Sequence, residues 1–68
     1  MSDSIYKTVD IIGSSSNSVE DAIEGAVAKA ARTVKHLNWF EVSEIRGHIE
    51  NDKVAHYQVA LKLGFRLD

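Results

Sequence analysis

Apolar residues recur at regular spacing in three parts of the chain, and the spacing differs from one part to the next. In residues 5–12, Ile5, Val9 and Ile11 alternate with polar residues, which is typical of a half-buried strand. The alternation is clearest in residues 57–67, where every second side chain is apolar. These patterns predict a first strand near the N-terminus and a long last strand.

Between these strands, apolar residues recur every three or four positions from Val19 to Leu37. This spacing predicts one apolar stripe on a helix of about five turns. Ser18 is expected to cap the helix by accepting a hydrogen bond from the backbone N–H of Asp21. The serine-rich segment 13–18 is predicted to be a loop, and it lacks the Gly-Lys-Ser/Thr ending of a phosphate-binding P-loop.

A second strand is predicted over residues 39–46, and the turn formers of residues 50–53 should close a hairpin between it and the last strand. The element order is then β-α-β-β. The helix returns the chain so that the first two strands run the same way, with the last strand antiparallel between them, in the order 1-3-2. We therefore predict an α+β fold, a three-stranded antiparallel sheet with one helix on one face, as a single domain over residues 1–68.

The chain has 68 residues, which is small for a self-sufficient core. A domain of this size buries only about 60% of its unfolded surface. Cysteine is absent, which excludes disulfides and thiolate metal sites. His36, His48 and His56 lack the short spacing of metal ligands, so a metal site would need residues brought together by the fold or by subunits. Because both sheet edges are open, we expect an oligomer.

The charge balance and hydropathy narrow the classes of partner. The net charge is −2 and the pI is about 5.8, whereas nucleic-acid binders usually carry a basic face. No apolar run approaches the length of a membrane span. We expect a cytoplasmic protein that binds neither nucleic acid nor membrane.

No catalytic machinery is visible in the sequence. No motif places a histidine beside the serines of the loop. Glu41 and Glu44 are three residues apart on a strand, so they are expected to point to opposite faces and not to form an acid–base pair. We therefore expect a protein that is not an enzyme.

Four residues form a set suited to an aromatic, polar and anionic ligand. Trp39, the only tryptophan, offers a flat stacking surface. The amide of Gln58 can both donate to and accept from an imide-like edge, and Arg46 and Arg66 carry guanidinium groups that match phosphate. Each also has a structural interpretation. Trp39 could be a core or subunit-interface residue, and the three polar residues could be solvated surface groups.

Taken together, several segments of the chain resemble bacterial-type dodecins. The resemblance is carried by Tyr6-Lys7, Gly13-Ser14-Ser15, Ala22-Ile23 with Ala26, Thr33, Leu37-Asn38-Trp39-Phe40-Glu41-Val42, Arg46-Gly47-His48-Ile49, Tyr57-Gln58-Val59 and Gly64-Phe65-Arg66-Leu67. It covers residues 5–67 without a large insertion or deletion. The Trp-Phe-Glu-Val and Tyr-Gln-Val segments, in this order and spacing, are its most specific part.

The resemblance implies a hollow dodecameric shell that binds flavins without acting as a flavoenzyme. Two flavins would lie as a pair between tryptophans of neighbouring subunits, with Trp39 stacked on the ring. Gln58 would hydrogen-bond the polar edge of the ring, and Arg46 would meet the phosphate of FMN. Tyr6 and Arg66 match positions near the ligand.

The resemblance also implies storage and sequestration of FMN, and of riboflavin, with quenching of their photochemistry. Some bacterial members hold coenzyme A at a separate site, for which Lys7 and Lys29 are the candidates. Ser4 stands where a relative has a basic residue near the phosphate, which would reduce the preference for FMN over riboflavin. The alternative function is a structural or protein-interaction oligomer that binds no ligand.

Overall fold

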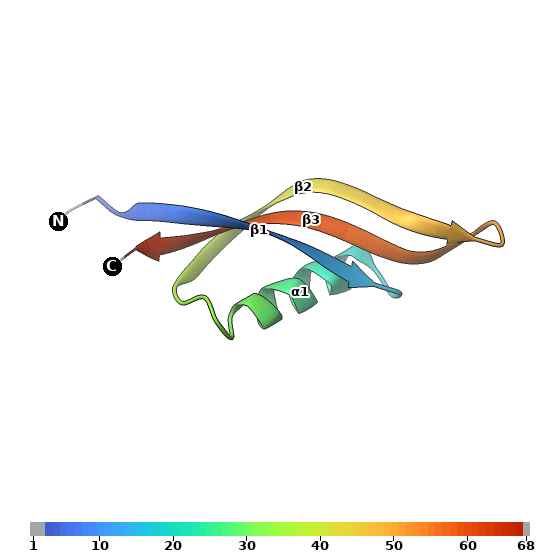
Figure 1. The fold of residues 1–68 in the computed structure, drawn as a ribbon, viewed down its shortest axis with the longest axis horizontal. Coiled ribbons are helices and arrows are strands. Elements are labelled where there is room, and N and C mark those ends of the chain that lie inside the picture. The colour runs from blue at the N-terminus through green and yellow to red at the C-terminus, as the bar shows by residue number, and fades with distance from the viewer. Residues whose placement is uncertain (1–2, 68) are drawn as a thin grey trace.

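The computed structural model describes residues 3–67, which form one three-stranded sheet with a helix packed on one side (Figure 1). The elements are β1 (Ile5–Ser15), α1 (Val19–Ala30), β2 (Leu37–Glu50) and β3 (Lys53–Leu67). The strand order is β1-β3-β2, and β3 runs antiparallel to both neighbours. The predicted fold class, element order and strand order are confirmed.

The helix covers one face of the sheet, here called the helix face, and leaves the other face, the open face, uncovered. The core lies on the helix face, where Val59, Leu61 and Leu63 of β3 pack under Ala22 of α1 and are fully buried. Partly buried residues complete it: Val9, Ile11, Val19, Ile23, Ala26, Val27, Ala30 and Leu37. Since side chains alternate along a strand, the even-numbered residues of β3, among them Gln58, Gly64 and Arg66, belong to the open face.

The predicted loop of residues 13–18 is only partly a loop, because β1 continues to Ser15. The Ser15 hydroxyl stabilises this end by accepting from the backbone N–H of Asn17 at 2.9 Å and donating to the Asp21 carboxylate at 2.7 Å. Gly13 lies directly under α1, where a Cβ atom would overlap the backbone carbonyl of Ala22. A glycine here lets the helix approach the strand closely.

The helix is shorter than the predicted five turns and ends at Ala30 after twelve residues. Beyond it, the N–H groups of Arg32 and Thr33 donate to carbonyls three residues earlier. This is the hydrogen-bond pattern of a 3₁₀ turn, and it ends the α-helix. His36 then adopts a left-handed conformation with φ 66°, and Leu37 begins β2. Within residues 3–67, no helix has the length and hydropathy needed to cross a lipid bilayer.

Two predicted local features are confirmed. The Ser18 hydroxyl accepts a hydrogen bond from the backbone N–H of Asp21 at 2.9 Å and so caps α1. Asn51 and Asp52 form a two-residue hairpin turn with φ values of 52° and 63°. Positive φ at both central residues is the conformation that matches the twist of the paired strands.

The chain is a thin plate with principal extents of 55 × 20 × 14 Å. The turn of the β2–β3 hairpin extends beyond α1 at one end, while the start of β1 and the end of β3 lie at the other (Figure 1). Many large apolar side chains of residues 3–67 are exposed: Ile5, Tyr6, Ile12, Trp39, Phe40, Val42, Ile45, Ile49, Val54 and Leu67. One chain therefore leaves more large apolar side chains exposed than it buries.

Candidate functional site

Trp39 lies against the backbone of Gly64 on the open face. The two residues are opposite each other in the β2–β3 register, next to a register shift between Leu37 and Trp39. A Cβ atom at Gly64 would overlap the indole ring, so only glycine leaves the ring room to lie there. The tryptophan remains 40% exposed. Sequence reasoning did not assign Gly64 a role, although a glycine inside a strongly alternating apolar strand is a signal of close approach.

Arg46 and Gln58 lie opposite each other further along the same strand pair and are in contact. The Arg46 Nε–H donates to Gln58 Oε1 at 3.3 Å. Because a guanidinium group has no acceptor, this contact turns the amide oxygen toward Arg46 and leaves the amide NH₂ donors for other partners. Arg46 Nη1 also lies 3.2 Å from Glu44 Oε1, and both side chains are more than half exposed.

The prediction that Glu41 and Glu44 point to opposite faces is wrong. Glu41 is opposite Lys62 and Glu44 is opposite Ala60, two residues of β3 that lie on the same face. An irregularity between Val42 and Glu44 adds one unpaired residue to β2 and restores Glu44 to the open face. Glu44 and Arg46 are two residues apart with no irregularity between them, so the bulge places both on the open face, where they are in contact. Periodicity alone gave no sign of the bulge.

The predicted ligand residues all belong to the open face, but they form two groups. The Trp39 end contains Trp39, Gly64, Arg66 and Tyr6, the last two being opposite each other in the register. The Arg46 end contains Arg46, Gln58 and Glu44.

Gly64 lies six positions after Gln58 on β3, which is about 20 Å along an extended strand. A single chain therefore does not bring the tryptophan and the glutamine together around one small ligand.

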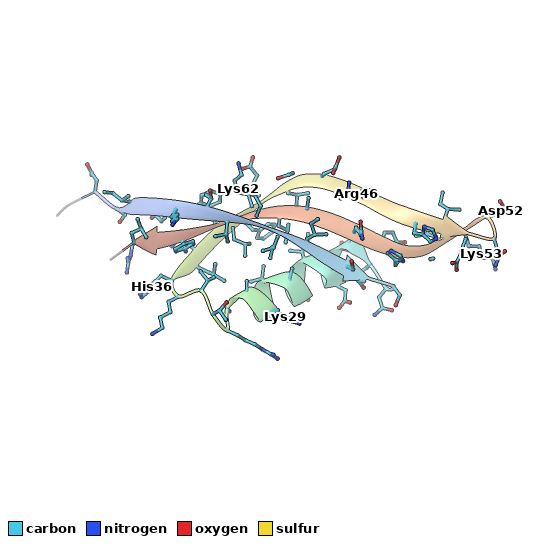
Figure 2. The ribbon with its side chains drawn as sticks, in the orientation of Figure 1. Lys29, His36, Arg46, Asp52, Lys53 and Lys62 are labelled. Atoms are coloured by element: carbon cyan, nitrogen blue, oxygen red, sulfur yellow. The ribbon has the colours of Figure 1, made fainter. Side chains whose placement is uncertain are left out.

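Lys7 and Lys29, the candidates for coenzyme A, do not converge. Lys7 lies opposite Phe65 near the start of β1. Lys29, in the last turn of α1, borders a groove of about 400 Å³ that Lys7 does not line. Figure 2 shows Lys29 on the helix, on the other side of the sheet from Arg46 and Lys62. The structure thus offers a groove beside one of the two lysines only.

His48 and His56 are cross-strand neighbours, although the sequence assigned them to separate elements. Their rings are stacked with centroids 5.5 Å apart and an interplanar angle of 23°. His48 Nε2 also lies 3.7 Å from Glu50 Oε2. In the part of the chain that the structure describes, no group of three or more histidine, cysteine, aspartate or glutamate residues is arranged to hold a metal ion.

A family model described as Dodecin matches residues 5–68 of the chain. The chain belongs to the dodecin family. The dodecin of Thermus thermophilus is 50% identical over 64 residues, which cover 94% of this chain and 93% of that protein. The structure of dodecin from Streptomyces coelicolor has a TM-score of 0.92 and 47% identity, covering 100% of this chain and 97% of the other. The family predicted from the sequence is confirmed.

Other dodecin structures differ in what they describe. A calcium dodecin from Mycobacterium tuberculosis, reported with a novel calcium-binding site, has a TM-score of 0.80 and 31% identity, covering 94% of this chain and 91% of the other. The Thermus dodecin structures include variants with a tryptophan replaced by phenylalanine or one of two arginines replaced by alanine. Those three variants each match 97% of this chain with a TM-score of 0.91.

Proposed function

We propose that this protein binds flavins, both FMN and riboflavin, and stores them without transforming them. The flavins lie in pairs between the Trp39 side chains of neighbouring subunits in a closed dodecamer. The observation that carries the proposal is the indole of Trp39, which rests on Gly64 and stays 40% exposed on the open face. A flat aromatic surface backed by the sheet and open on its outer side suits a stacked isoalloxazine ring.

The separation of the Trp39 end from the Arg46 end supports a site shared between chains. A flavin ring stacked on Trp39 of one chain cannot reach Gln58 of the same chain across about 20 Å of strand. A neighbouring copy can supply the glutamine. The exposed apolar side chains on both faces of the sheet support the same conclusion, because assembly would bury them.

The Arg46 end carries groups that match the rest of an FMN molecule. The NH₂ donors that Arg46 leaves on Gln58 suit the carbonyl oxygens at the polar edge of the flavin ring. Arg46 itself suits the phosphate, and Arg66 and Tyr6 lie beside the stacking surface. The tryptophan and the two arginines replaced in the Thermus variants are of the same types as Trp39, Arg46 and Arg66. Their positions in that chain are each one lower than in this chain.

Such a site favours storage over catalysis. With an indole on one face of each flavin and a second flavin on the other, a substrate or oxygen has little access to the reactive ring. Electron transfer from the stacked indole also quenches an excited flavin before it can damage its surroundings. The bound flavin is then protected and its free concentration is buffered.

A pair of matched variants tests the proposal against a ligand-free oligomer. Trp39→Leu removes the stacking ring but keeps apolar bulk, whereas Phe40→Leu removes the next ring along β2, which belongs to the helix face. We expect Trp39→Leu to weaken FMN and riboflavin binding by about 5- to 150-fold, since stacking on an aromatic ring is worth about 1–3 kcal/mol. Phe40→Leu should change either affinity by less than about three-fold.

Calorimetric titration gives the affinities, and sedimentation velocity confirms that each variant keeps the parent's assembly. Unchanged affinity in Trp39→Leu would identify Trp39 as a packing residue and contradict the proposal.

A further inference from the structure

Glu44 occupies one of the donor groups of Arg46 that a flavin phosphate would use. Its Oε1 atom lies 3.2 Å from Arg46 Nη1. Arg46 Nε is at the same time committed to Gln58 Oε1 at 3.3 Å. Two of the three guanidinium nitrogens of Arg46 are therefore already in contact with side chains of the protein, Glu44 and Gln58.

The surrounding charges add little to attract a phosphate. Glu44 cancels the charge of Arg46 locally, and His48, two residues further along β2, lies 3.7 Å from the carboxylate of Glu50. From β1, the residue opposite Gln58 is Ser14, which is uncharged. A phosphate that approaches Arg46 must therefore displace Glu44 or lie beside its carboxylate, and either costs free energy.

We infer that Glu44 is a specificity-determining residue that lowers the preference of the site for phosphorylated flavins over riboflavin. The inference rests on the proposed flavin site. Riboflavin has the same ring system but no phosphate, so it does not compete with Glu44 for the guanidinium group. The contact between Arg46 and Gln58 uses a different nitrogen, so recognition of the ring edge continues while Glu44 is bound. The Glu44 carboxylate thus lets one site store both FMN and riboflavin.

The test is Glu44→Gln, which removes the charge and keeps an amide oxygen able to accept from Arg46. We expect the Kd for FMN to fall by about three- to ten-fold, because a carboxylate a few ångströms from a phosphate repels it modestly in water. The Kd for riboflavin should stay within about two-fold of the parent value. Glu24→Gln is the matched control. It makes the same change in net charge on the exposed surface of α1, and it should leave the ratio of the two affinities unchanged.

A double variant shows whether Glu44 acts through Arg46. In an Arg46→Ala background, Glu44→Gln should alter the FMN-to-riboflavin ratio by less than about two-fold. The gain in the single variant should also shrink as salt is raised, since both groups are exposed.

Three results would overturn the inference: equal gains for both ligands, an unchanged ratio in Glu44→Gln, or a full gain that persists without Arg46. If the parent protein bound neither flavin, the proposed function itself would fail. Riboflavin binding by the parent distinguishes the two cases.

Discussion

At the scale of single residues, the candidate site depends on contacts that the sequence only partly predicts. Alternation along β3 correctly assigned Gln58 and Arg66 to the face away from the core. It could not predict that the indole of Trp39 rests on Gly64, because that contact depends on the register of two strands. Nor could it predict that Glu44 shares the open face with Glu41, because the bulge in β2 leaves no periodic signal.

Gly64→Ala tests the seat of the tryptophan. The added Cβ would overlap the indole, so we expect the ring to move, its near-ultraviolet circular dichroism to change and flavin affinity to fall by at least about five-fold. Gly25→Ala is the control, because its added Cβ meets no atom within 4 Å and alanine favours the helix by about 1 kcal/mol. Full flavin affinity in Gly64→Ala would show that flavin binding does not depend on where the indole of Trp39 lies on β3.

At the scale of elements, the turn and the helix cap were predictable from the sequence, whereas the residue at which the helix ends was not. The Asn51-Asp52 turn and the Ser18 cap follow from residue types that favour those conformations. The helix was predicted too long because Val34 and Leu37 continue the helical spacing after the chain has left the helix. The spacing of apolar residues indicates which residues face the core. Residues of an α-helix and of the loop that follows it can both show this spacing.

Ser18→Ala tests the start of α1. Removing a side-chain cap leaves the backbone N–H of Asp21 without this acceptor and costs about 1 kcal/mol of stability. Ser16→Ala, a change at the neighbouring exposed loop residue, should cost at most about 0.5 kcal/mol. Chemical denaturation of both variants measures the difference. Equal losses of unfolding free energy in the two variants would show that the hydrogen bond of the Ser18 cap does not stabilise the protein.

At the scale of the whole molecule, the sequence predicted that a chain this small needs neighbours, and the structure indicates which surface they would cover. The helix packs over β1 and β3, so the helix-face residues of β2 beyond Leu37 are left exposed. Phe40, Val42 and Ile45 lie opposite core residues of β3 and yet are 51%, 37% and 56% exposed. This surface was not predictable from periodicity, because alternation assigns residues to a face and not to the part that the helix reaches.

Ile45→Asp tests whether assembly covers this surface. A carboxylate buried there without a partner costs several kcal/mol, so we expect smaller species in sedimentation velocity and loss of flavin binding. Ile45→Val keeps the surface apolar and should sediment like the parent. An Ile45→Asp protein with the parent's sedimentation coefficient and flavin affinity would show that this surface stays in water.

The account's central claim is that flavins stack on Trp39, and the chain has no other tryptophan, so its fluorescence reports on this one residue. The measurement is a titration of the purified protein with riboflavin that follows tryptophan emission and flavin emission together. We predict that both are quenched and that the signals saturate near one flavin for each chain. Tryptophan and flavin emission that both stay unchanged at equal concentrations of chain and ligand would contradict the account.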